Sequence, residues 1–93
     1  MILTFGDKDT ESLFNRERVK KIPLDISLRA RNKLLIINAA TSENDLCAPP
    51  GNHFERLKGD KKGWNSIRIN DQWRVIFKWT DGNARDVTIT DYH

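Results

Sequence analysis

The sequence predicts an α+β fold in which two N-terminal helices pack on a small antiparallel β-sheet. Apolar residues recur at helical spacing before residue 41, whereas residues 64–91 show the two-residue alternation of strands, interrupted by short turns. A chain of 93 residues can bury one small core and has no room for a second. We therefore expect a single domain over residues 1–93.

The N-terminal part is expected to hold a strand-like start and a short helix. The start consists of Ile2, Leu3 and Phe5. Asp7 or Asp9 can cap the helix that follows, and Leu13 and Phe14 lie on one side of it. The basic segment after this helix ends at Pro23 and is interpreted as a connection.

A second, longer helix is predicted to begin at Asp25 or Ser27 and to run to about Ala40. Apolar residues at roughly helical spacing are expected to form its buried face, namely Leu24, Leu28, Leu34, Leu35 and Ile37. Its other face would present Arg29, Arg31 and Lys33.

A loop is predicted from Thr41, because Pro49-Pro50-Gly51-Asn52 cannot continue a helix or a central strand. Strands are expected after it over residues 54–57, 64–69, 73–79 and 85–91. Asn70-Asp71-Gln72 and Asp81-Gly82 are expected to form the tight turns between the last three strands.

Alternation along these strands assigns the side chains to two faces of the sheet. The face that meets the helices is expected to carry Ile67, Ile69, Val75, Phe77, Val87 and Ile89. The uncovered face is expected to carry Arg68, Arg74, Thr88, Thr90 and Tyr92. Two arginines from adjacent strands on one face would form a rigid donor pair for phosphate oxygens. The alternative is that they only solubilise an exposed sheet face.

Charge is unevenly placed although the net charge is only +3. Basic residues crowd residues 16–33, and a second group consists of Arg56, Lys58, Lys61 and Lys62. This local excess suits an anionic partner, either nucleic acid or an acidic protein, and two solvated faces are the alternative. Trp64 is expected on the same face of its strand as Arg68, where it could stack on an RNA base or be structural. Trp73 and Trp79 are expected in the core.

Several classes of protein find no support in the sequence. The N-terminus does not resemble a signal peptide, and no apolar run approaches the roughly 20 residues of a membrane span. Cys47 alone cannot form an internal disulfide, so a cytoplasmic location is expected. His53, His93 and Cys47 lack the spacing of a zinc site, and the glycines form no nucleotide-binding loop. We expect no metal and no cofactor.

The chain resembles the HigB branch of the RelE/ParE toxin superfamily over nearly its whole length, with the specific motifs in its second half. The stretches that carry the resemblance are Leu57-Lys58-Gly59-Asp60, Gly63-Trp64-Asn65-Ser66-Ile67-Arg68-Ile69-Asn70, Gln72-Trp73-Arg74-Val75-Ile76-Phe77, Asp81-Gly82 and the terminal Asp91-Tyr92-His93. The resemblance implies a microbial-ribonuclease-like fold and a type II toxin that cuts translated mRNA on the ribosome. It also implies two partners, the 16S rRNA of the small subunit and a HigA-like helix-turn-helix antitoxin.

Carried over by this resemblance, the active positions are Lys58, Arg68, Arg74, Asp91, Tyr92 and His93. The reaction would be attack of the 2′-hydroxyl on the neighbouring phosphate, with cations holding the phosphate and the C-terminal residues serving proton transfer and base stacking. Many relatives have a histidine where this chain has Glu55, which could act as the base but would repel the phosphate. His53 is a weaker candidate for the role of that histidine. A frayed tail is the alternative for the last three residues.

Basic and aromatic residues outside the active positions are interpreted as RNA or ribosome contacts, namely Arg29, Arg31, Lys33, Lys61, Lys62 and Trp64. For residues 29–33 the antitoxin is the other possible partner. Two other functions remain open at this point. A ParE-like toxin would inhibit DNA gyrase as a protein ligand, and a simple RNA-binding module would use the basic sheet face without cutting RNA.

Overall fold

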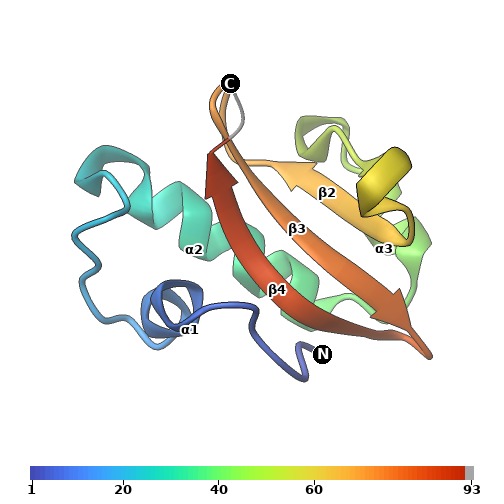
Figure 1. The fold of residues 1–93 in the computed structure, drawn as a ribbon, viewed down its shortest axis with the longest axis horizontal. Coiled ribbons are helices and arrows are strands. Elements are labelled where there is room, and N and C mark those ends of the chain that lie inside the picture. Colours follow the sequence, from blue (N-terminus) through green and yellow to red (C-terminus); the bar gives the residue numbers. More distant parts are fainter. Residues whose placement is uncertain (92–93) are drawn as a thin grey trace.

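A computed structural model describes residues 1–91 of the chain. It has three α-helices, α1 (Lys8–Phe14), α2 (Leu24–Ala39) and α3 (Glu43–Cys47), and two short 3-10 helices, η1 (Pro50–Asn52) and η2 (Gly59–Lys61). The strands are β1 (Glu55–Arg56), β2 (Trp64–Arg68), β3 (Trp73–Thr80) and β4 (Asn83–Asp91). They form one antiparallel sheet in the order β1-β2-β3-β4, and α2 crosses behind β3 and β4 in Figure 1. The predicted α+β arrangement is confirmed.

The N-terminal segment follows its prediction closely. Asp7 caps α1, and its side chain accepts a hydrogen bond of 2.9 Å from the backbone N–H of Thr10. The strand-like start lies beside β4 as two isolated parallel bridges, Ile2 to Ala84 and Phe5 to Val87. The chain start is therefore joined to the last strand, although the two are far apart in sequence.

The core lies between the sheet and α2, as the alternation of the strands predicts. All six side chains expected on the covered face are at most 8% exposed: Ile67, Ile69, Val75, Phe77, Val87 and Ile89. Trp73 is buried with them and Trp79 packs against the same cluster, which confirms the structural interpretation of both rings.

The predicted buried face of α2 is wrong in three of its five positions. Leu24, Leu28 and Leu35 are 71%, 61% and 47% exposed. The residues that contact the core are instead Ile26, Ala30, Leu34 and Ile37. Leu28 is two residues from both Ile26 and Ala30, which is about 200° around a helix, so its side chain points away from the sheet. The prediction followed the largest aliphatic side chains, whereas the sheet packs against a row that contains the small Ala30.

Two local predictions also differ from the structure. The N-cap of α2 is Pro23 rather than Asp25 or Ser27, and the Ser27 hydroxyl donates to the Pro23 carbonyl at 3.1 Å. Residues 43–47, predicted as loop, form α3. Five residues are too few for helical periodicity to be recognised, and the helix depends on a capping box between Ser42 and Asp45.

None of the helices within residues 1–91 is both long and apolar enough to span a bilayer.

Candidate active site

The uncovered face of the sheet carries the two arginines that the sequence placed there. Arg68 on β2 and Arg74 on β3 are register partners, and Arg74 pairs in turn with Thr90 on β4. All three side chains are half-buried, and they alternate with the buried residues of the covered face. The shared face of these residues agrees with the prediction. Tyr92, which alternation assigned to the same face, lies outside the described residues.

A hollow of about 350 Å³ opens over this arginine pair. Among residues 1–91 it is lined by His53, Glu55, Arg68, Asn70, Asp71 and Arg74. Its walls come from three places in the chain: the segment around β1, the ends of β2 and β3, and the turn that joins them. The lining holds two arginines and two carboxylates, which makes it strongly polar.

The guanidinium group of Arg74 is held from three sides. Its Nε donates to Ser66 Oγ at 2.6 Å, and its Nη2 donates to the carbonyl oxygen of His53 at 2.5 Å. The Glu55 carboxylate lies 3.9 Å from its Nη1. The Arg74 side chain is only 12% exposed, so its guanidinium group sits in a fixed position at the base of the hollow.

Backbone conformation places the carbonyl that Arg74 uses. His53 follows η1 and adopts a left-handed conformation with φ 43°, which is uncommon for a residue other than glycine. Left-handed residues with side chains cluster at functional sites, although turns contain them too. The sequence pointed to His53 only as a weak candidate, yet it lines the hollow and supplies a hydrogen bond to the site.

Arg68 is held differently, by the turn that follows its own strand. Its guanidinium forms an ion pair with Asp71, whose side chain is 95% exposed. The turn is ordered by Asn70, whose side-chain oxygen accepts the backbone N–H groups of Gln72 and Trp73 at 2.9 and 2.8 Å. The sequence marked Asn70 and Asp71 only as turn residues, and their presence in the hollow follows from the tertiary arrangement.

Glu55 and Lys58 are separated by the end of β1. Glu55 pairs with Ser66 in the sheet register and therefore lies on the side of Arg74. The strand ends at Arg56, and Lys58 precedes η2, where Gly59 turns the chain with φ 67°. Lys58 is exposed and is not among the described residues that line the hollow.

The C-terminal candidates are only partly described. Asp91 ends β4 opposite Trp73, and the alternation of side chains along β4 assigns it to the same face of the sheet as Val87 and Ile89. Its side chain accepts a hydrogen bond of 3.1 Å from Gln72 Nε2. The structure therefore places Asp91 beside the β2–β3 turn and not among the described lining of the hollow. His93 lies, like Tyr92, outside the described residues.

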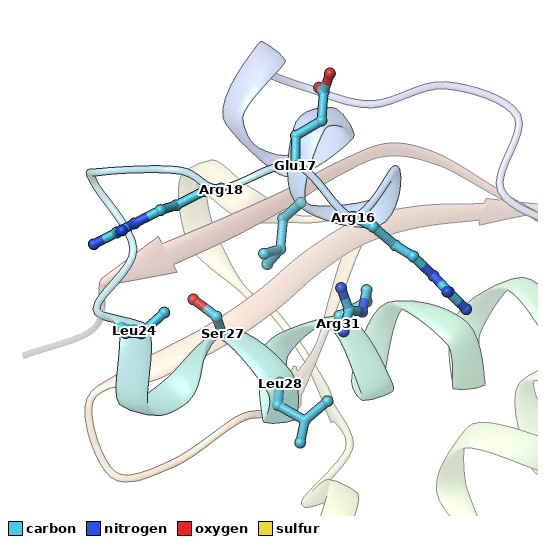
Figure 2. Close-up of a pocket in the computed structure, with 8 residues that line it drawn as sticks. Arg16, Glu17, Arg18, Leu24, Ser27, Leu28 and Arg31 are labelled. Carbon is cyan, nitrogen blue, oxygen red and sulfur yellow. The ribbon is translucent and has the colours of Figure 1, made fainter.

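The basic residues expected to contact RNA have different environments. Lys33 donates to Asn52 Oδ1 at 2.8 Å, and Asn52 is buried. Burial, with a smaller effect of Arg29, lowers the pKa of Lys33 below its usual value. Lys33 thus joins α2 to η1. Arg31 lies two residues from each of these cations and so projects from the opposite side of α2, beside the segment after α1 (Figure 2). The prediction that Arg29, Arg31 and Lys33 share one face is therefore wrong.

Trp64 is the centre of a second cationic group on the uncovered face. Its ring lies 5.4 Å from Lys61 Nζ and 5.0 Å from Lys78 Nζ. Lys78 is the register partner of Trp64 on β3, and the sequence analysis did not single it out. Lys62 is exposed at the end of η2, next to this group.

Comparison with known proteins identifies relatives over the whole chain. Residues 3–93 match the family described as the RelE-like toxin of the type II toxin-antitoxin system HigB. Toxin HigB-1 of Vibrio cholerae is 47% identical over 100% of this chain and 98% of its own length. Endoribonuclease HigB of Proteus vulgaris is 30% identical, and the match covers 100% of both chains.

Solved structures with the same fold are more distant in sequence. The YoeB-YefM complex from Staphylococcus aureus contains a chain that superposes with a TM-score of 0.63 at 16% identity, covering 100% of this chain and 98% of that chain. YafQ from E. coli superposes with a TM-score of 0.57 at 18% identity, covering 98% of this chain and 93% of that chain. At such identities the superpositions show a common fold.

Proposed function

Because the chain belongs to the family of RelE-like HigB toxins of type II toxin-antitoxin systems, we propose that it is an endoribonuclease that cuts translated mRNA on the ribosome. The observation that supports this most directly is the pair Arg68 and Arg74, fixed side by side beneath an open polar hollow. A phosphodiester is the ligand that two such planar donors suit best. The relative from Proteus vulgaris bears the name of an endoribonuclease, which agrees with this proposal.

The proposed reaction needs neither a metal nor a protein nucleophile. The 2′-hydroxyl oxygen attacks the adjacent phosphorus and forms the new O–P bond, while the bond from phosphorus to the 5′-oxygen of the next nucleotide breaks. The hydroxyl proton passes to a base and the leaving oxygen receives a proton, giving a cyclic phosphate and a 5′-hydroxyl. Arg68 and Arg74 would stabilise the charge that grows on the phosphate oxygens.

The two acids that contact the arginines would take different parts in this reaction. Asp71 is exposed and pairs with Arg68, so a substrate phosphate would replace it. Glu55 lines the hollow close to Arg74, and we assign it the role of the base that accepts the 2′-hydroxyl proton. A carboxylate in this position lies next to a fixed cation, which offsets its repulsion of the phosphate.

The remaining candidates would act from the rim of the hollow. Lys58 can reach an anion from outside β1, because an exposed lysine side chain has a flexible stem. Asp91 would orient the end of β4 through Gln72. For Tyr92 and His93 we keep the roles of base stacking and of proton donor to the leaving oxygen.

Contacts with the ribosome would come from the cationic residues beside the hollow and from the basic residues of α2. Lys61, Lys62 and Trp64 lie on or beside the uncovered face and are proposed to meet the RNA on either side of the cut. Arg29, Arg31 and Lys33 lie on α2, in the layer behind the sheet, and would contact 16S rRNA rather than the mRNA. This activity would require a cytoplasmic location, and a HigA-like helix-turn-helix antitoxin is proposed as the partner that neutralises it.

The proposal is tested by incubating the purified protein with a short mRNA on programmed ribosomes. The wild type should release fragments with a cyclic phosphate and a 5′-hydroxyl, and Arg74→Ala should reduce the rate by at least about 100-fold. Arg85→Ala is the matched control, because Arg85 is an exposed arginine near the other end of β4, and it should stay within about twofold. Full cleavage by the Arg74 variant, or inhibition of DNA gyrase without RNA cleavage, would contradict the proposal.

A further inference from the structure

Asn52 is a buried polar residue close to the hollow, and the proposed chemistry does not use it. It is only 1% exposed and ends η1, directly before His53. Burying a side-chain amide is unfavourable unless its donor and acceptor atoms find partners. The partners of Asn52 therefore show which segments of the chain it holds together.

The side chain of Asn52 joins η1 to two helices. Its Nδ2 donates to the Leu46 carbonyl oxygen at 3.1 Å, in the last turn of α3, where helix carbonyls have no partner within the helix. Its Oδ1 accepts a hydrogen bond of 2.8 Å from Lys33 Nζ on α2. Lys33 is half-buried, so Asn52 supplies a partner for an ammonium group that is partly removed from water. The position of Asn52 is thus fixed from both sides.

The short path from Asn52 to the sheet leaves the backbone of His53 little freedom. Only His53 and Phe54 lie between Asn52 and Glu55, and Glu55 is fixed by its pairing with Ser66. His53 takes up the connection with a left-handed backbone, at φ 43° and ψ 55°. Such a conformation is unfavourable for a residue with a side chain, and it persists only where the surrounding structure fixes it.

The outcome of this local geometry is the direction of one carbonyl group. The His53 oxygen accepts the hydrogen bond of 2.5 Å from Arg74 Nη2, while Ser66 Oγ accepts from Nε of the same guanidinium group. The bond to Ser66 alone would let the planar group swing about Nε. The second bond, at Nη2, fixes the plane of the group.

We propose that Asn52 is a positioning residue of the nuclease site, which fixes the His53 carbonyl and through it the orientation of the Arg74 guanidinium group. The inference rests on the proposed endoribonuclease function. Arg74 can stabilise the phosphate only if its remaining donors are aimed at it, and a displacement of about 1 Å can cost on the order of 100-fold in rate. Lys33 takes part as the anchor of Asn52.

Asn52→Ala is compared with Thr10→Ala, which serves as the matched control. Thr10 is also 1% exposed, and its hydroxyl accepts a hydrogen bond of 2.9 Å from the Ile89 N–H, which joins α1 to β4. Both variants should lower the melting temperature by about 5–15 °C, because each removes a buried hydrogen-bonding side chain. A purely structural role of Asn52 would therefore make the two variants behave alike.

Cleavage of mRNA on programmed ribosomes separates the two variants. In single turnovers with saturating toxin, at a temperature where both variants are folded, Asn52→Ala should be at least about tenfold slower than the wild type. Thr10→Ala should stay within about twofold. The toxin concentration that gives half of the maximal rate should change less than about twofold in both, because the defect lies in the chemical step and not in binding.

A double-mutant cycle shows whether Asn52 acts through Arg74. Asn52→Ala should slow the residual cleavage of Arg74→Ala by less than about twofold, because the group that Asn52 positions is already absent. An effect of Asn52 on the fold or on another catalytic group would instead slow cleavage by the same factor in both backgrounds.

Nuclear magnetic resonance of the Arg74 guanidinium group gives a readout that needs neither activity nor ribosomes. In the wild type, the bonds to Ser66 and His53 should slow rotation of the group enough to give separate signals for the Nη hydrogens, which Arg74→Ala assigns by their absence. These signals should merge in Asn52→Ala and stay separate in Thr10→Ala. If Asn52→Ala does not fold, Lys33→Met removes the anchor and should merge them as well.

Three results would overturn the positioning role of Asn52. One is a loss of cleavage in Thr10→Ala equal to that in Asn52→Ala. Another is an undiminished effect of Asn52→Ala in the Arg74→Ala background. The third is separate Nη signals in both Asn52→Ala and Lys33→Met. If the wild type cuts no RNA, the proposed function fails, whereas the spectra still decide whether Asn52 orients Arg74.

Discussion

Arg68 and Arg74 are directly opposite each other in the β2–β3 register, yet each is held by its own acid, Asp71 and Glu55 respectively. Like charges directly opposite in a sheet are destabilising unless something compensates them. The compensation here is unequal, because Arg74 also has hydrogen bonds to Ser66 and His53, whereas Arg68 depends on an exposed turn residue. The pair thus combines one fixed cation with one that can be released to a substrate.

Ser66→Ala should loosen the fixed cation. Ser66 is fully buried, and its loss leaves the Arg74 Nε donor without its partner, so we expect the free energy of unfolding to fall by about 1–3 kcal/mol. Cleavage should fall about tenfold, because the guanidinium is no longer held in one position. Urea unfolding and the ribosome assay measure the two effects. Thr90→Ala on the same face is the control, and equal effects of both substitutions would contradict the assigned role of Ser66.

Asp71→Asn should release the second cation. The ion pair with Arg68 is exposed, so stability should change by less than about 1 kcal/mol. Affinity for a short RNA should rise and become more sensitive to salt, because one more arginine is available to phosphate. Fluorescence anisotropy at several salt concentrations would show this. Asp60→Asn, at an exposed acid of η2, controls for the change in net charge, and an equal gain there would remove the special role of Asp71.

Glu55→Gln tests the assignment of the base. The amide keeps the shape of the side chain but cannot accept the proton, so kcat should fall by at least about 100-fold. KM should stay constant or decrease, because a negative charge has been removed from beside the phosphate. Single-turnover and steady-state cleavage assays distinguish the two parameters. A large rise in KM with unchanged kcat would show that Glu55 only positions Arg74.

Asp45 makes part of the stability of the fold dependent on pH. Hydrogen bonds from the Thr41 backbone and hydroxyl, and from Ser42, lower the pKa of Asp45 below its ordinary value. A depressed carboxyl pKa contributes stability above the unfolded-state pKa, and this contribution is lost as the pH falls through the folded-state pKa.

Asp45→Asn should therefore lower the melting temperature at neutral pH and have a decreasing effect as the solution becomes more acidic. Thermal melts followed by circular dichroism over a pH series measure this difference. Asp60→Asn again serves as the control. A destabilisation by Asp45→Asn that does not change with pH would show that the charge of Asp45 has no part in capping α3.

Several features of this protein were set by residues close together in the chain, and these could be predicted from the sequence. Strand alternation has a period of two, so the shared face of Arg68 and Arg74 followed directly from their places in β2 and β3. Asp7 at the start of α1 and the Asp81-Gly82 turn are likewise local, because caps and tight turns form between neighbouring residues. The sequence motifs also sufficed to identify the family, which the comparisons confirm.

Other features depended on contacts between segments far apart in the chain. The side of α2 that packs on the sheet is the one that carries the small Ala30, which is fully buried, whereas Leu28 is 61% exposed. The His53 carbonyl reached Arg74 only because the segment before β1 folds against β2. Helical periodicity gives the spacing of side chains but not which side of a helix will be covered, and that choice belongs to the packing of the whole fold.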